Sequence, residues 1–183
     1  MRKLELGLCI LLLATTLIAC TEAMKLKDTA GPWIVELNST QSYNTRSEFQ
    51  PAEQSGYSYW MLFLIDEMGH EVGWISFRSY SYPQKATKDF LDEMLNQRIK
   101  YFQVTSPTKT SSEVDGTEAR MGEGYSSVYS RKWRGVAWAY KPSFDSFTNT
   151  NVTKHFINFD SLQDPAEFEQ IVASLHITNA TNM

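Results

Sequence analysis

Residues 57–65 carry large apolar side chains on both faces of one predicted strand, and this feature constrains the fold most. Successive side chains of an extended chain point to opposite faces. One face carries Tyr57, Tyr59, Met61, Phe63 and Ile65, and the other carries Trp60, Leu62 and Leu64. A strand that is apolar on both faces must be covered on both faces. We therefore expect it in the interior of a sheet with packing layers on both sides.

The segments that follow predict a hairpin and then a helix. Residues 66–70 contain a turn glycine and lead into an apolar run at 72–80, which predicts an antiparallel neighbour. Between residues 86 and 102 the apolar positions recur at helical spacing instead, which predicts an amphipathic helix. We expect other strands at 33–37, 111–114, 117–121, 133–140 and 154–159, with 38–55 forming a loop or an irregular edge.

A second helix is predicted near the C-terminus. Asp164 is the expected N-cap, Pro165 occupies the first helical position, and Glu167 follows three residues after the cap. The apolar stripe of this helix consists of Phe168, Ile171, Val172 and Leu175. With the strands, these helices predict a single α+β domain over residues 31–178, an antiparallel sheet with helices on its faces in an α/β/α sandwich.

The closing segment also carries a family resemblance. Its F-x-x-I-x-x-S-L-x-I pattern is formed by Phe168, Ile171, Ser174, Leu175 and Ile177. This pattern, with the order of elements, resembles the Mog1/PsbP-like α/β/α sandwich superfamily. The resemblance implies helices on opposite faces of the sheet. It also implies an accessory, assembly or binding role, because few members of that fold are enzymes.

The N-terminus predicts export and lipid attachment. Residues 1–19 have a short basic start and then an apolar run that is too short to span a membrane comfortably, which is the layout of a signal peptide. Residues 17–20, Leu-Ile-Ala-Cys, resemble the lipobox of prokaryotic lipoproteins. The resemblance implies cleavage before Cys20 and lipidation of its sulfur. We expect a tether at 20–30, a flexible tail at 179–183, and anchoring at the cell surface, or at the outer membrane of a host with two membranes.

Charge and cysteine content exclude several function classes. The chain has a net charge of −4, so we expect no nucleic acid partner. Its two cysteines are Cys9 and Cys20, of which the first would leave with the signal peptide and the second would carry lipid. No cysteine chemistry then remains for the mature chain. His70-Glu71 lacks the second histidine of a zinc motif, and we expect no metal or cofactor.

The most suggestive polar cluster lies at residues 125–134, where aromatic and basic side chains gather in an acidic chain. The candidate binding patch consists of Tyr125, Tyr129, Arg131, Lys132, Trp133 and Arg134. It could bind an acidic partner, a sugar or lipid headgroups. The alternative is that its charges protect a strand edge against aggregation. A fainter run of the same kind begins at Arg78. Four tryptophans are expected in the core, and Trp133 on a surface.

The leading functional hypothesis is a non-enzymatic lipoprotein that binds or helps to assemble another envelope component. One alternative is a module that binds a soluble ligand, a lipid or a carbohydrate. A second is a hydrolase, which would need a cleft that gathers at least two of His155, Asp145, Asp160 and Ser161.

Three N-glycosylation sequons are present. They begin at Asn38, Asn151 and Asn179, and we expect them in loops or in the tail. They matter only in a host that glycosylates exported proteins.

Overall fold

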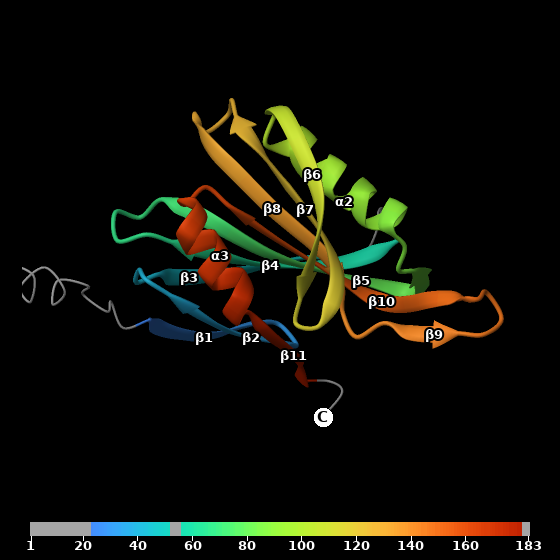
Figure 1. The fold of residues 1–183 in the computed structure, drawn as a ribbon. Helices are drawn as coiled ribbons and strands as arrows, with labels where there is room; N and C mark the ends of the chain where they lie inside the picture. The colour runs from blue at the N-terminus through green and yellow to red at the C-terminus, as the bar shows by residue number, and fades with distance from the viewer. Residues whose placement is uncertain (1–22, 52–55, 181–183) are drawn as a thin grey trace, which may run out of the picture.

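The computed structural model describes residues 23–51 and 56–180, in which antiparallel strands form two sheets (Figure 1). The larger sheet has eight strands in the order β3-β4-β5-β10-β8-β7-β6, with β9 paired to β10. Its strands are β3 (Asn44–Gln50), β4 (Tyr57–Ile65), β5 (Glu71–Lys85), β6 (Val104–Val114), β7 (Thr117–Ser126), β8 (Arg131–Ala139), β9 (Ser143–Asp145) and β10 (Thr150–Ser161). The smaller sheet has the order β1-β2-β11, with β1 (Met24–Ala30), β2 (Trp33–Ser39) and β11 (His176–Asn179).

The prediction of an interior strand with two apolar faces is confirmed. β4 lies between β3 and β5, and its pairing with β5 is the predicted hairpin. Leu62 and Leu64 enter the core on one face of the sheet, whereas Phe63 enters the core on the other. Residues 38–55 include the edge strand β3, one of the two expected alternatives.

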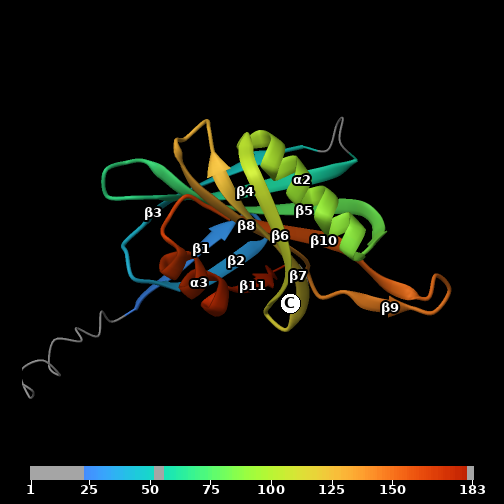
Figure 2. The ribbon, with the colours of Figure 1, turned by 45° about the horizontal axis from the view of Figure 1, so that its top comes forward.

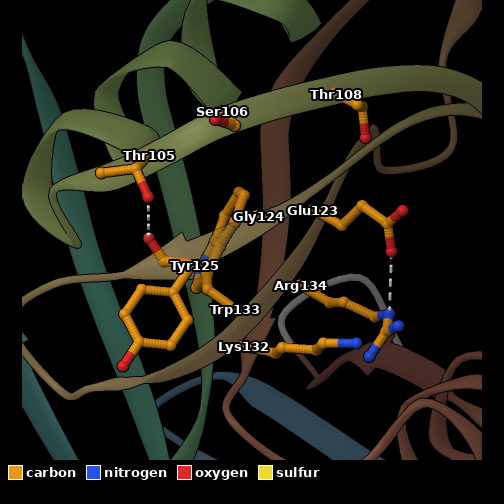
Figure 3. Close-up of a pocket in the computed structure, with 9 residues that line it drawn as sticks. All are labelled: Thr105, Ser106, Thr108, Glu123, Gly124, Tyr125, Lys132, Trp133 and Arg134. Atoms are coloured by element: carbon orange, nitrogen blue, oxygen red, sulfur yellow. Dashed lines mark hydrogen bonds and ion pairs between the residues drawn. The ribbon is translucent and has the colours of Figure 1, made fainter.

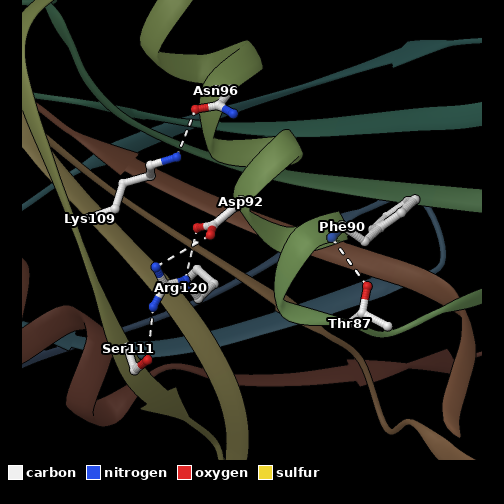
Figure 4. A network of polar contacts seen from close by, with 7 residues as sticks. All are labelled: Thr87, Phe90, Asp92, Asn96, Lys109, Ser111 and Arg120. Atoms are coloured by element: carbon white, nitrogen blue, oxygen red, sulfur yellow. Dashed lines mark hydrogen bonds and ion pairs between the residues drawn. The ribbon is translucent and has the colours of Figure 1, made fainter.

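Helix α2 (Lys88–Tyr101) covers one face of the large sheet. Its N-cap is Thr87, and its apolar side buries Leu91, Met94 and Leu95 against the sheet. Polar contacts hold the outer side of the helix to β6 and β7 (Figure 4). In these contacts Arg120 Nε donates to Asp92 Oδ1 at 2.8 Å, and Lys109 Nζ donates to Asn96 Oδ1 at 3.0 Å. The helix is therefore fixed along its length.

The smaller sheet and helix α3 (Pro165–Ser174) cover the opposite face (Figure 2). Asp164 caps α3 as predicted, because its carboxylate accepts from the Glu167 backbone N–H at 3.0 Å. The Glu167 carboxylate is buried. It accepts hydrogen bonds from Ser39, Thr40 and Tyr43, and so ties α3 to the segment after β2.

The predicted α/β/α sandwich is wrong. Strands make up 61% of the described residues and helices 16%, and the second face of the large sheet is covered by another sheet as well as by α3. The difference arises from β1 and β11, which the sequence analysis assigned to a tether and to the frayed end of the chain. β1 is largely exposed, and β11 has only four residues, so neither shows a clear alternating pattern.

Several predictions near the termini need correction. Residues 24–30, expected in the tether, form β1 and pair with β2. Asn179, expected in the tail, is buried and pairs with Trp33. The sequon residues Asn38, Asn151 and Asn179 all lie in strands, not in loops or a tail. The predicted signal peptide, Cys20 and residues 181–183 lie outside the described part of the chain.

Candidate functional site

The predicted basic–aromatic patch lies at one end of the β7–β8 hairpin. β7 ends at Ser126, β8 begins at Arg131, and the residues between them form a turn. Four of the six predicted side chains are exposed there, namely Tyr125, Tyr129, Arg131 and Lys132. These four residues therefore form a surface cluster, as the sequence indicated.

Trp133 was predicted at a surface, but it is completely buried at 0% exposure. A Cβ atom at Gly122 or Gly135 would lie only 3.2 Å or 2.4 Å from the indole, so the two glycines provide the space that the ring fills. The indole Nε1–H donates to Asp160 Oδ1 at 3.1 Å. Because side chains alternate along β8, Trp133 enters the core beneath α2.

Part of the predicted patch lines a shallow pocket of about 390 Å³ beside β6 (Figure 3). The pairing of β6 with β7 is interrupted between Thr105 and Thr108. Arg134 points toward Glu123, with 3.3 Å between its Nε and the carboxylate oxygen. Its charge is thus already balanced, and Lys132 supplies the other positive charge of this lining.

A second pocket, of about 360 Å³, lies between the C-terminal half of α2 and the β3–β4–β5 part of the sheet. We call it the arginine–tyrosine pocket. It is lined by Gln50, Pro51, Tyr57, Tyr59, Met61, Arg78, Gln97, Arg98 and Tyr101. From the sequence, only Arg78 was expected in a basic–aromatic run, whereas Tyr57, Tyr59 and Met61 were recognised as one face of a strand.

Strand register and helix periodicity bring these residues together. Tyr59 of β4 lies directly opposite Arg78 of β5, so both side chains point to the α2 face. Arg98 and Tyr101 are three residues apart on α2, and therefore neighbours on one side of the helix. The guanidinium of Arg78 lies over the rings of Tyr57 and Tyr59, with its central carbon 5.3 and 6.0 Å from the two ring centroids.

The pocket contains a buried ion pair. Arg98 is 6% exposed, and its Nε donates to Asp160 Oδ2 at 2.6 Å. Burial acts to lower the pKa of Arg98, but the adjacent Asp160, with Tyr59 and Tyr101, outweighs burial and the pKa is raised. Burial raises the pKa of Asp160, and Arg98 and the Trp133 N–H oppose that shift.

Arg78 is the second buried cation. It is 4% exposed, and within the described residues no carboxylate lies at ion-pair distance from it. Its Nη1 donates to Gln97 Oε1 at 2.8 Å, whereas its buried Nε–H has no hydrogen-bond partner there. Burial raises the pKa of Tyr80, and the nearby Arg78 opposes this shift. Among the described residues, the two arginines thus have one carboxylate, which pairs with Arg98, and one positive charge is left over.

More buried polar atoms without hydrogen bonds lie beside this pocket. They are Arg98 Nη2, Ser76 Oγ and the side-chain amide of Asn158. Ser76 lies opposite both Met61 and Asn158 in the sheet, in the row next to Tyr59 and Arg78. Buried polar atoms in folded proteins nearly always have partners. This concentration under α2 marks a region able to bind polar groups of a ligand or water.

The residues proposed for a hydrolase are not gathered in one cleft. Asp160 is 0% exposed and engaged with Arg98, and Ser161 is also buried. Asp145 lies in the exposed β9 turn, where it accepts hydrogen bonds from Phe147 and Thr148. His155 contacts Ser79 at 3.0 Å and packs edge-on against Trp33 on the face away from α2.

Neither a metal-binding cluster nor a membrane-spanning helix is found in the described part of the chain. Residues 23–51 and 56–180 contain no group of three or more histidine, cysteine or acidic side chains able to hold a metal ion. The same residues contain no helix that is long and apolar enough to cross a membrane. Comparison with protein-family models and with curated proteins finds no match to this chain.

Proposed function

We propose that this protein is an exported lipoprotein whose domain binds a small anionic ligand in the arginine–tyrosine pocket without catalysing a reaction. Export and lipidation at Cys20 rest on the N-terminal sequence pattern. Ligand binding rests on the pocket beneath α2. A volume of about 360 Å³ is near the low end of the roughly 300–1,000 Å³ of small-molecule sites.

One observation carries the proposal, namely the guanidinium of Arg78, buried without a carboxylate partner among the described residues. Burying a charge is costly unless it is paired and hydrogen-bonded. Asp160 forms an ion pair with Arg98, so its single negative charge cannot neutralise both arginines. An anion in the pocket would supply the missing charge and hydrogen bonds, and the gain would appear as binding affinity.

The test uses the mature lipoprotein purified in detergent and a set of small carboxylates and phosphates. Ligand binding should raise the melting temperature, because a ligand that binds only the folded state stabilises it. Arg78→Gln should abolish this response. Lys132→Gln is the matched control, because it removes a positive charge from the other pocket and should leave the response intact. If no anion raises the wild-type melting temperature, ligand binding at this site is refuted.

The anchor has a separate test. Cys20→Ala should leave the precursor uncleaved or release a soluble form, because no sulfur remains for lipid attachment. Cys9→Ala, which changes the other cysteine inside the predicted signal peptide, should still give a lipidated and membrane-bound protein. Membrane retention and cleavage of the Cys20→Ala protein at wild-type levels would contradict lipidation.

A second candidate function, docking to another envelope protein, is favoured by the arm formed by β9 and the turn that leads from it to β10, residues 143–150. Phe144 and Phe147 are 65% and 95% exposed on it. The arm lies at the opposite end of the domain from the start of β1 (Figure 1). Apolar side chains exposed at a tip can mark an interaction site.

Affinity capture from native membranes tests this docking. A partner retained by the wild type should be lost with Phe144→Ser/Phe147→Ser. It should be kept with Val128→Ser, which changes an exposed apolar residue on the β7–β8 turn. Equal capture by all three proteins would refute docking through the arm.

A further inference from the structure

We infer that the arginine–tyrosine pocket selects a monocarboxylate carried on a flat aromatic body. This inference rests on the proposed function, and it names the class of ligand. Three features of the pocket lead to it: its surplus charge, the unpartnered Nε–H of the Arg78 guanidinium, and the aromatic walls.

The charge of the pocket matches a monoanion. Among the described residues, Arg78 and Arg98 contribute two positive charges, and Asp160 contributes one negative charge. A carboxylate would leave the site neutral, whereas a phosphate dianion would leave a buried negative charge. The pocket also receives Gln97, Arg98 and Tyr101 from the C-terminal end of α2. That end of a helix carries partial negative charge, which disfavours a dianion further.

The unpartnered Nε–H of Arg78 fits a carboxylate. Nη1 donates to Gln97, and the guanidinium also hydrogen-bonds Tyr80, but no partner among the described residues takes the Nε–H. This N–H therefore remains for a ligand. Guanidinium edges bind carboxylates through two parallel N–H···O bonds, and such charge-assisted pairs are stronger than neutral hydrogen bonds. Lysine cannot present this fork.

The walls of the pocket fit a flat ring. Tyr57, Tyr59 and Tyr101 line it together with Met61, and the two arginines already lie over the tyrosine rings. Aromatic faces stack favourably on planar groups, and a methionine adapts its shape to the group it contacts. A body without polar substituents on its faces would fill this space, with its carboxylate directed to Arg78.

The test is calorimetric titration of the mature lipoprotein in detergent with four probes: 2-naphthoate, 2-naphthamide, glucuronate and phenyl phosphate. We expect 2-naphthoate to bind tightest, and the uncharged amide to bind at least about tenfold more weakly, because it lacks a charge-assisted bond. Arg78→Gln should weaken 2-naphthoate binding by about tenfold or more, and Arg78→Lys should restore it only in part. Lys132→Gln should leave it unchanged.

Tyr59 provides a test of the stacking. Tyr59→Phe keeps the ring and should bind 2-naphthoate within about threefold of the wild type, whereas Tyr59→Leu should lose about tenfold. Should Arg78→Gln not fold, nuclear Overhauser contacts from naphthoate protons to Tyr57, Tyr59 or Tyr101 in the wild type decide the matter. Their absence would overturn the inference.

The outcomes separate this inference from the proposed function. If glucuronate or phenyl phosphate binds more tightly than 2-naphthoate and this binding depends on Arg78, the preference for an aromatic carboxylate is refuted. The proposed anion site would then still stand. Binding of 2-naphthamide as tight as that of 2-naphthoate would remove the role of charge. If no probe binds in an Arg78-dependent way, both the inference and the proposed function fall.

Discussion

The ion pair between Arg98 and Asp160 gives the sharpest prediction for stability. Asp160→Asn preserves the shape of the side chain and its capacity to accept the Trp133 N–H, so it removes mainly the negative charge. Arg98 remains charged at every accessible pH, since a guanidinium does not deprotonate in proteins. The variant would therefore contain an uncompensated buried cation. Breaking a buried pair from one side costs about 3–5 kcal/mol of unfolding free energy.

This cost is large for a domain of this size. Total stabilities are roughly 5–15 kcal/mol, so the variant would lose a substantial part of its stability. Each kcal/mol lowers the melting temperature of a domain of about 150–250 residues by about 2–4 °C, so we expect a fall of about 6–20 °C. Urea unfolding followed by tryptophan fluorescence measures the change, and an unchanged m-value shows that the same surface is exposed on unfolding.

The reciprocal variant, Arg98→Met, behaves differently because Asp160 can lose its charge. Burial raises the pKa of Asp160, and without Arg98 the main opposing influence is gone. A carboxyl whose pKa is higher in the folded than in the unfolded protein favours the folded state while it is protonated. This contribution is complete below the unfolded-state pKa and is lost as the pH rises through the folded-state pKa. Compared with Arg98→Met/Asp160→Asn, the single variant should therefore lose stability between pH 4 and pH 8.

The control is an exposed pair on β3, between Arg46 and Glu48, whose side chains are both 50% exposed. Glu48→Gln should cost less than about 1 kcal/mol, because solvent screens this pair. The reasoning is refuted if Asp160→Asn costs no more than Glu48→Gln. It is also refuted if the double variant of Arg98 and Asp160 loses the sum of its two single losses, since removing both charges should relieve the penalty.

Three further predictions concern single residues. Burial lowers the pKa of His155 below its ordinary 6.5, so the neutral imidazole favours the folded state above that pH and the protein loses stability on acidification. His155→Gln should reduce the fall in unfolding free energy measured between pH 7 and pH 5. Asp164→Ala should cost about 1 kcal/mol in urea unfolding through loss of the α3 N-cap, and a change near zero would refute the cap. Gly135→Ala should cost about 3 kcal/mol, because its Cβ would lie 2.4 Å from the Trp133 ring, whereas Gly73→Ala, whose Cβ meets a movable side chain at 3.1 Å, should cost less. Equal costs for the two alanine variants would contradict the assigned role of the glycine.

Local patterns predicted much of the fold because they depend on interactions between near neighbours. The two apolar faces of β4, the hairpin to β5 and the helical spacing in α2 can all be recognised in short windows. The N-cap of α3 is equally local. β11 escaped prediction because it is held in place by β2, which is distant in the chain, and β1 escaped it because its residues are largely exposed. Without β1 and β11 the smaller sheet could not be recognised, so both faces of the large sheet were expected to be covered by helices alone.

The candidate pocket escaped prediction for a related reason. Arg98 lies between the apolar positions of its helix, yet it is buried because Asp160, 62 residues away, meets it under α2. Trp133 was expected at a surface because basic residues adjoin it, whereas the gap above Gly122 and Gly135 accepts its ring. A sequence signal existed in β10, where Asp160 lies among Phe156, Ile157, Phe159 and Leu162, but its partner could not be identified without the register.

The sequence alone thus determined where individual strands and helices form, which faces of β4 must be covered, and the pattern from which export is predicted. These properties follow from alternation, helical periodicity and capping, which act over a few residues. Only the tertiary structure decided which charges are buried together and which tyrosines surround them. Tyr59 meets Arg78, and Arg98 meets Asp160, through sheet register and helix packing. Those arrangements depend on contacts between segments far apart in the chain.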